Sequence, residues 1–241
     1  MYAVLSDIHG NLYALESVII DMEKYPVDGI ILLGDLIDYG MQSNEVVEHI
    51  KEKLTDKVIC NIWGNHEHAI LTDDFSHFSS QRGVDSARHT AGQLSDETRD
   101  YLDQKLIHEG LAEFELKGKH ILSVHASLED PYWKAIAPDN VRGDYERYDF
   151  VLSGHSHLSH FFTKFYDSDD PKRRNRHVVH FLNPGSVGQP RDLDPNAKYA
   201  LIDIDAGNVL FRSVPYDIEA AMSLFDGSVD DFYRERLEFG V

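Results

Sequence analysis

The sequence predicts an α/β protein, a four-layer αββα sandwich with two mixed β-sheets. In the first 62 residues, short runs rich in Val, Ile and Leu alternate with helix-like segments, which is the βαβαβ pattern of parallel strands with helical crossovers. In the second half, apolar runs follow one another closely and glycine-containing turns join some of them, which favours antiparallel or mixed pairing. About ten strands are buried most economically by two sheets with a helix layer outside each.

The expected elements follow one another along the chain. The runs expected as strands are Tyr2–Ser6, Ile30–Leu33, Val58–Ile62, Glu113–Leu116, His120–Val124, Phe150–Ser153, His160–Phe165, Val178–Leu182, Tyr199–Ile204 and Val209–Val214. The segments expected as helices are Leu12–Glu23, Ser43–Leu54 and one or two helices within Asp217–Phe239. Lys117-Gly118-Lys119 and Ala206-Gly207-Asn208 are expected as hairpin turns.

The stretch of about residues 72–110 differs from its surroundings. It is polar, carries no strand signal and contains a helix start at Leu94-Ser95-Asp96-Glu97, where Ser95 suits the N-cap position. We expect a helical insertion that lies over one rim of a single domain spanning residues 1–241.

The composition is that of a globular protein, with 42% hydrophobic and 11% aromatic residues. Cys60, the single cysteine, excludes an internal disulfide framework and predicts a buried, reduced thiol. The net charge of −19 disfavours a nucleic-acid polymer as partner, because its phosphates would be repelled. No run approaches the roughly 20 apolar residues of a membrane span, and the N-terminus shows no signal-peptide pattern. A cytoplasmic protein is therefore expected, with its oligomeric state left open.

Five of the expected strands are followed by side chains that bind metals. These residues are Asp7, His9, Asp35, Asn65, His66, His125, His155 and His157. Open α/β sheets bind ligands beyond the carboxyl ends of their strands, so the side chains would meet at one edge. Imidazole and carboxylate suit zinc, iron, manganese or nickel, and no thiolate is offered. Two such ions roughly 3.5–4 Å apart can deprotonate a water and clamp a phosphoryl oxygen. Glycines at 34, 64 and 154 would let the backbone turn sharply into the site.

The order of these motifs resembles the calcineurin-like metallophosphoesterase superfamily. The motifs are Asp7-Ile-His9, Gly34-Asp35-x-x-Asp38-x-Gly40, Gly64-Asn65-His66-Glu67, His125 and Gly154-His155-Ser156-His157. The segment Asn183–Gly188 is similar to a motif of the small bacterial branch, which includes phosphodiesterases and diadenosine tetraphosphate hydrolases.

The resemblance implies a role for each residue. The implied metal ligands are Asp7, His9 and His157 for one ion, Asn65, His125 and His155 for the other, and Asp35 as the bridge. A metal-bridging hydroxide would attack phosphorus. His66 would stabilise the transition state or protonate the leaving oxygen, a role that contributes about 10²–10⁴-fold. Asp38 would orient His66, and Glu67 has no direct role. Mn²⁺ or iron is the expected cofactor, with Zn²⁺ and Ni²⁺ as alternatives.

Two positions depart from the eukaryotic-type protein Ser/Thr phosphatases of this superfamily. Those enzymes carry arginines that grip the substrate phosphate where this sequence has Tyr39 and Trp63. The expected substrate therefore moves from phosphoproteins toward small phosphorylated molecules. Arg191 is the first candidate for the missing phosphate contact, with a surface arginine as the alternative.

A nucleotide or dinucleoside polyphosphate is the favoured substrate, and three features bear on it with alternatives open. The basic run Lys172–Arg176 is either a loop tip or a polyphosphate clamp. Tyr132 and Trp133 are either core residues or a stack for a nucleobase. The insertion offers His77, Arg82, Arg88 and His89, which either contact substrate or form a solvated face. The alternative functions are a broad-range phosphodiesterase or phosphomonoesterase, phosphoproteins included, and a non-catalytic scaffold of the same fold.

Overall fold

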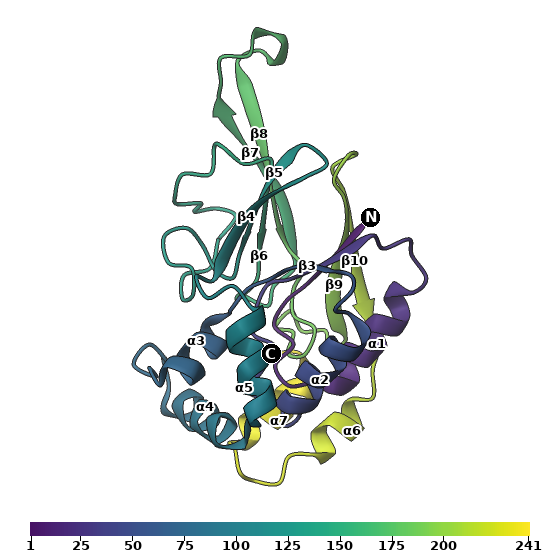
Figure 1. Cartoon of the computed structure of the whole chain (residues 1–241), viewed down its shortest axis with the longest axis vertical. Helices are drawn as coiled ribbons and strands as arrows, with labels where there is room; N and C mark the ends of the chain where they lie inside the picture. The colour runs from purple at the N-terminus through teal and green to yellow at the C-terminus, as the bar shows by residue number, and fades with distance from the viewer.

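The computed structural model describes residues 1–241 and contains two five-stranded sheets and seven α-helices. The helices gather at one end of the molecule, and the second sheet extends away from them (Figure 1). No helix is long and apolar enough to cross a membrane.

The first sheet has the strand order β10-β9-β1-β2-β3. Its strands are β1 (Tyr2–Leu5), β2 (Gly29–Leu32), β3 (Val58–Asn61), β9 (Ala197–Asp203) and β10 (Asn208–Val214). The first three pair in parallel, with Tyr2 opposite Gly29, and β9 and β10 pair antiparallel. The parallel βαβαβ unit is confirmed. It brings the carboxyl ends of β1, β2 and β3 to the same edge.

The second sheet has the order β4-β5-β6-β8-β7. Its strands are β4 (Leu111–Leu116), β5 (Lys119–Val124), β6 (Phe150–Ser153), β7 (His160–Asp167) and β8 (Arg176–Asn183). Parallel pairing joins β5, β6 and β8, and antiparallel pairing adds the outer strands, so the sheet is mixed as expected. The expected turn between β4 and β5 is present, with Lys117 and Gly118 both at positive φ.

The helices occupy the connections and the C-terminal part of the chain. They are α1 (Leu12–Met22), α2 (Ser43–Lys53), α3 (Asn65–Thr72), α4 (Gln81–Gln93), α5 (Asp96–Lys105), α6 (Ile218–Ser223) and α7 (Asp231–Phe239). Ser95 caps α5 by accepting a hydrogen bond from the Thr98 amide at 3.1 Å, as its sequence position predicts. α4 and α5 lie in the stretch expected as a helical insertion.

Three apolar clusters hold the layers together. Helices cover the outer face of the first sheet in a cluster of 26 buried residues, and a cluster of 13 lies between the sheets. A third cluster of eight covers the outer face of the second sheet. The two-sheet sandwich is confirmed, but this last layer differs from the expected helices. It is the irregular segment 126–149, which supplies Ile136, Tyr145 and Tyr148, and it contains Pro131 and Pro138, which disfavour helix. The C-terminal helices pack instead on the side of the first sheet, where α6 contacts α1.

Candidate active site

The expected metal ligands lie together at one edge of the two sheets. Asp7 and His9 follow β1, Asp35 follows β2, and Asn65 begins α3 shortly after β3. From the second sheet, His125 follows β5, and His155 and His157 follow β6. All seven side chains are buried except that of His155, which is half-buried. The convergence expected from the strand ends is therefore present.

The backbone is left-handed at most of these positions. Asp7, His9, Asp35, His155 and His157 have φ between 48° and 63°. Residues other than glycine adopt this region at a cost, and such positions concentrate at functional sites. Here the left-handed backbone makes the sharp turns that aim successive side chains into one small volume.

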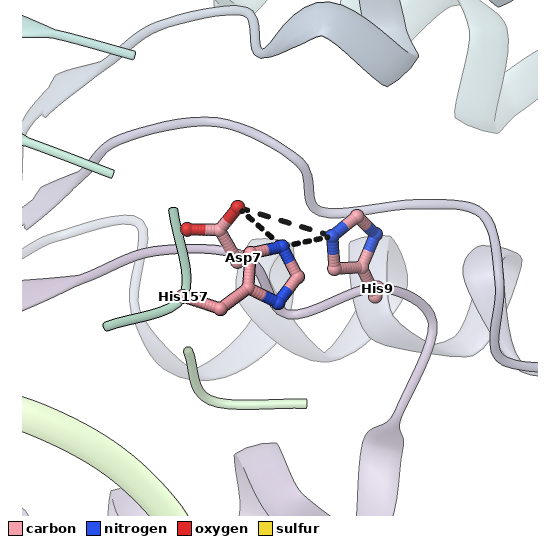
Figure 2. A group of neighbouring side chains, drawn as sticks. All are labelled: Asp7, His9 and His157. Carbon is pink, nitrogen blue, oxygen red and sulfur yellow. Dashed lines mark hydrogen bonds and ion pairs between the residues drawn. The ribbon is translucent and has the colours of Figure 1, made fainter. Parts of the chain in front are cut away.

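One cluster is formed by Asp7, His9 and His157 (Figure 2). The Nε2 atoms of the two histidines are 3.2 Å apart, and His157 Nε2 is 3.2 Å from Asp7 Oδ1. Asp7 Oδ1 is fully buried and has no hydrogen-bond partner. A buried carboxylate oxygen without a donor is costly, and two imidazole nitrogens beside it make the set fit a cation.

A second cluster shares Asp35 with the first. Asp35 Oδ2 is 3.6 Å from His9 Nε2 on one side and 3.3 Å from His125 Nε2 on the other. The Asn65 side-chain oxygen is 2.9 Å from both His125 Nε2 and His155 Nδ1. Asp35, His125 and His155 form a further group with metal-binding distances. One carboxylate thus lies between two groups of nitrogen and oxygen atoms, the arrangement that two neighbouring ions require.

Backbone carbonyls hold three of the imidazoles. The Nδ1 atoms of His9 and His125 bond the carbonyl oxygens of Ile37 at 3.2 Å and Leu33 at 2.7 Å. The Nδ1 atom of His157 bonds the carbonyl oxygen of Gln189. Because Nδ1 carries the proton in such a bond, Nε2 presents its lone pair to the cluster when the ring is neutral.

Burial and charge set the protonation of the imidazoles. Burial lowers the pKa of His9 and His157, and it lowers that of His155 to about 3, so these rings are neutral at pH 7. Burial also acts to lower the pKa of His125, but the adjacent Asp35 carboxylate outweighs it and raises that pKa to about 9. A bound cation would reverse this preference for the proton.

His66 lies beside the clusters and pairs with Asp38. The His66 Nδ1 atom is 2.6 Å from Asp38 Oδ2, and its Nε2 atom is 4.0 Å from Asp35 Oδ2. Burial favours a lower pKa for His66, yet the carboxylates of Asp35 and Asp38 together raise it. The orienting contact implied for Asp38 is present. It fixes the ring so that Nε2 faces the clusters.

The insertion takes part in this arrangement, which the sequence did not indicate. Ser86 and Thr90 of α4 each donate a hydrogen bond to Asp38 Oδ1 at 2.8 Å. The carboxylate of Asp38 therefore lies between the insertion on one side and His66 on the other.

Glu67 has a positioning role that sequence reasoning missed. Its buried carboxylate accepts hydrogen bonds from the amides of Asp35, Leu36 and Gly64 at 2.7–2.8 Å. It thereby ties the turn after β2 to the start of α3. The available signal was its place three residues into a helix, where Glu reaches back to free amides.

The three site glycines act for two different reasons. Gly34 has a φ of +89°, as a sharp turn requires. A Cβ on Gly64 would lie 2.1 Å from Asp35 Oδ1, and a Cβ on Gly154 would lie 2.0 Å from Ser6 Oγ. The expectation of turning freedom holds for Gly34, whereas Gly64 and Gly154 are needed for close approach.

Comparison with known proteins identifies the family. The sequence model of the calcineurin-like phosphoesterase superfamily domain matches residues 1–207. The chain belongs to this superfamily. It is 30% identical to an uncharacterized protein of Methanocaldococcus jannaschii, over 100% of this chain and 98% of that protein. A metallophosphoesterase from Sphaerobacter thermophilus superposes with a TM-score of 0.73 at 27% identity, covering 100% and 99% of the two chains. A hypothetical protein from Pyrococcus horikoshii superposes with a TM-score of 0.78 at 23% identity, covering 100% of this chain and 98% of that one.

The chain is thus a metal-dependent phosphoesterase of the small branch, and its buried His/Asp clusters are typical of a dimetal site. Its phosphorylated substrate must reach them. A pocket of about 300 Å³ opens on the clusters, and its other lining residues include Tyr39, His77, Phe78, Trp133 and Arg191. His77 stacks on Trp133 with ring centroids 5.6 Å apart, and Phe78 meets Trp133 edge-on at 5.3 Å. The phosphoesterase pocket therefore has an aromatic wall and a guanidinium group.

Other sequence candidates lie outside this pocket. Lys172–Arg176 forms the tip of the β7–β8 hairpin, which projects away from the helices (Figure 1). Each strand of that hairpin has eight residues, so the tip lies roughly 25 Å from the strand ends that carry the site. The basic run is too distant to clamp a substrate bound at the clusters. Trp63 is buried and donates to the Leu102 carbonyl oxygen at 2.7 Å. Neither Tyr132 nor Arg88 lines the pocket.

Proposed function

We propose that this protein hydrolyses a phosphate ester or anhydride bond in a nucleotide or dinucleoside polyphosphate, using two metal ions. The observation that carries the proposal is Asp35, whose carboxylate lies between two groups of metal-type ligands at the floor of the pocket. Asp7, His9 and His157 would hold one ion, and Asn65, His125 and His155 the other. Asp35 would contact both. When bound, the ions would activate a water and neutralise charge on the phosphoryl oxygens.

The protein's own groups would do the remaining work. His66 lines the pocket, and its Nδ1 is occupied by Asp38. Its Nε2 can therefore hold a proton for the leaving oxygen or donate a hydrogen bond to the phosphoryl group. The raised pKa of His66 favours the protonated form that both roles need. Arg191 would bind a non-bridging phosphate oxygen, because a guanidinium group matches phosphate geometry.

The aromatic wall supports a nucleotide as the substrate. His77, Phe78 and Trp133 line the same pocket as Arg191 and contact one another through their rings. Stacking of a base on an aromatic side chain contributes about 1–3 kcal/mol. A substrate with a base and a phosphate would use both sides of the pocket, whereas a phosphoprotein offers no base.

We also propose that residues 1–241 act as one domain, with the insertion of about residues 72–110 as a part of the site. This proposal is supported by contacts between the insertion and the site. Ser86 and Thr90 hold Asp38, and His77 and Phe78 line the pocket.

The substrate proposal is tested by comparing kcat/KM for diadenosine tetraphosphate and for bis(p-nitrophenyl) phosphate with Mn²⁺-loaded protein. We expect the nucleotide to be the better substrate, and Trp133→Ala to lower its kcat/KM roughly tenfold, as a lost stacking contact predicts. An equal or better rate with the aryl diester would support the broad-range phosphodiesterase instead. Inertness of metal-loaded protein toward both substrates would favour the scaffold.

A further inference from the structure

Three arginines, one in the pocket and two linked to it through neighbouring residues, have no aspartate or glutamate partner. They are Arg82 of α4, Arg191 of the loop after Gln189, and Arg236 of α7. The chain has 42 acidic and 23 basic residues, and other arginines do find acids, such as Arg234 with Asp231 at 3.2 Å. None of the three has an Asp or Glu oxygen within 4.0 Å. The absence of an acid around three cations in an acidic protein indicates a place kept for an external anion.

α7 brings its arginine to the rim of the pocket. Tyr233 of α7 stacks on Tyr39 with ring centroids 4.4 Å apart and planes at 18°. Tyr39 lines the pocket and contacts the ring of His66 at 4.5 Å. At the end of α7, the Gly240 carbonyl oxygen accepts a hydrogen bond from the Leu193 amide at 2.8 Å, two residues after Arg191. The helix is thus attached to the site at two places.

Arg82 and Arg236 share a second platform. Both guanidinium groups lie over the ring of Phe232, at 3.9 Å and 4.8 Å from its centroid. Arg236 Nε donates to a main-chain oxygen of Val241, which leaves its two terminal nitrogens for another acceptor. The stacked planes hold the cations in fixed orientations, which lowers the entropy lost when an anion binds.

The charges of this group repel one another. Burial, and then repulsion from Arg191, lower the pKa of Arg236 to about 10. The side chain still carries its charge at pH 7, so the repulsion persists. No Asp or Glu side chain lies close enough to relieve this repulsion, and the unbonded Arg191 Nε is buried.

We propose that Arg236 and Arg82 form a binding site for a second phosphate group of the substrate, next to the cleaved phosphate that Arg191 contacts. The proposal rests on the proposed function and narrows it to molecules with at least two linked phosphates. Arg191, in the pocket, would contact the group nearest the metals, and the arginines of α7 and α4 would contact the one beyond. Arg236, on α7, lies outside the residues 1–207 that the family model matches, whereas Arg82 and Arg191 lie within them. With this site, the distant basic run Lys172–Arg176 is not required for the binding of a polyphosphate substrate.

The site is tested with Arg236→Gln and Arg82→Gln in metal-loaded protein. Arg234→Gln is the matched control, since it removes a guanidinium of α7 that pairs with Asp231. We expect the first two variants to raise KM for diadenosine tetraphosphate about tenfold or more, as loss of a charged hydrogen bond implies. Their effect on bis(p-nitrophenyl) phosphate should be at least several times smaller, and Arg236→Lys should recover part of the loss. Equal losses on both substrates would overturn the site, as would an unchanged KM.

Binding of pyrophosphate separates this site from the proposed function. Calorimetry of the metal-loaded protein should show pyrophosphate binding tighter than orthophosphate, and Arg236→Gln should remove most of the difference. Pyrophosphate binding through Arg236 in a protein that hydrolyses no nucleotide would leave the site standing and defeat the proposed function. If the protein hydrolyses nucleotides but wild type and Arg236→Gln bind pyrophosphate equally well, the proposed function would stand and the second phosphate site would be refuted.

Discussion

At the level of single side chains, the second hydrogen bond of each imidazole decides which nitrogen faces the cations. Leu33, Ile37 and Gln189 offer carbonyl oxygens to three rings, and Asp38 offers a carboxylate to His66. The distinction separates two kinds of histidine. Rings held by neutral carbonyls present a lone pair once they are neutral, as the proposed metal ligands need. The ring held by a carboxylate retains its proton, as the proposed general acid needs.

Replacement of His66 tests this distinction. We expect His66→Ala to retain both metals and to lose about 10²–10⁴-fold in kcat, because it removes proton donation without removing a ligand. Metal content per chain and steady-state rates measure the two effects. His66 also lies within metal-binding distance of His9 and Asp35. Loss of a metal from the variant would therefore make His66 a ligand and refute its separate role.

Metal binding should release a proton from His125. Its pKa is raised to about 9 by Asp35, so the metal-free ring is protonated at pH 7, and a cation can bind only when that proton leaves. Metal affinity should therefore increase from pH 7 toward pH 9 and level off above it. We expect calorimetric titrations with Mn²⁺ in two buffers of different ionisation enthalpy to give different binding heats. The difference should correspond to the release of about one proton per chain. Heats independent of the buffer at pH 7 would contradict the assignment.

At the level of secondary structure, the motifs predicted which strand ends meet, but not what supports them. Asp7 and Asp35 each follow a strand of the parallel βαβ unit, so their meeting follows from parallel pairing, whereas His125 comes from the second sheet. The contacts of Ser86 and Glu67 could not be foreseen, because they depend on how α4 and α3 pack after the sheets have formed. Hydrogen bonds between residues distant in sequence leave no local pattern.

The contacts of α4 with Asp38 lead to a test of the insertion. We expect Ser86→Ala with Thr90→Val to lower kcat about tenfold while the metal content stays unchanged, since Asp38 would lose two donors and hold His66 less firmly. Gln81→Ala serves as control, as it removes an exposed hydrogen bond on the same helix. Equal kcat in the double variant and wild type would exclude a role for the insertion in catalysis.

For the molecule as a whole, the proposed metal site and the basic run lie at opposite ends of the second sheet. The site lies at the carboxyl ends of its strands, and the basic run lies at the tip of a long hairpin (Figure 1). The sequence placed Lys172–Arg176 between two strands but could not tell their lengths or direction. The position of Arg236 near the pocket was not foreseen either, because it depends on how α7 packs against residues distant in sequence.

Neutralisation of the hairpin tip tests this separation. Arg173→Ala with Arg174→Ala should leave kcat and KM for diadenosine tetraphosphate within about twofold of wild type, because screening removes charge effects beyond a Debye length of about 8 Å. Steady-state kinetics at physiological salt measures the effect. A KM raised severalfold would bring the tip back to the substrate and contradict the distance inferred from the strands.

We propose that two ions, held by the clusters that share Asp35, perform the hydrolysis. Metal-stripped protein titrated with Mn²⁺, while hydrolysis of bis(p-nitrophenyl) phosphate is followed, tests it most directly. We expect no activity before addition and a rise that saturates at two Mn²⁺ per chain. Full activity at one ion per chain, or activity that persists in the stripped protein, would contradict the claim.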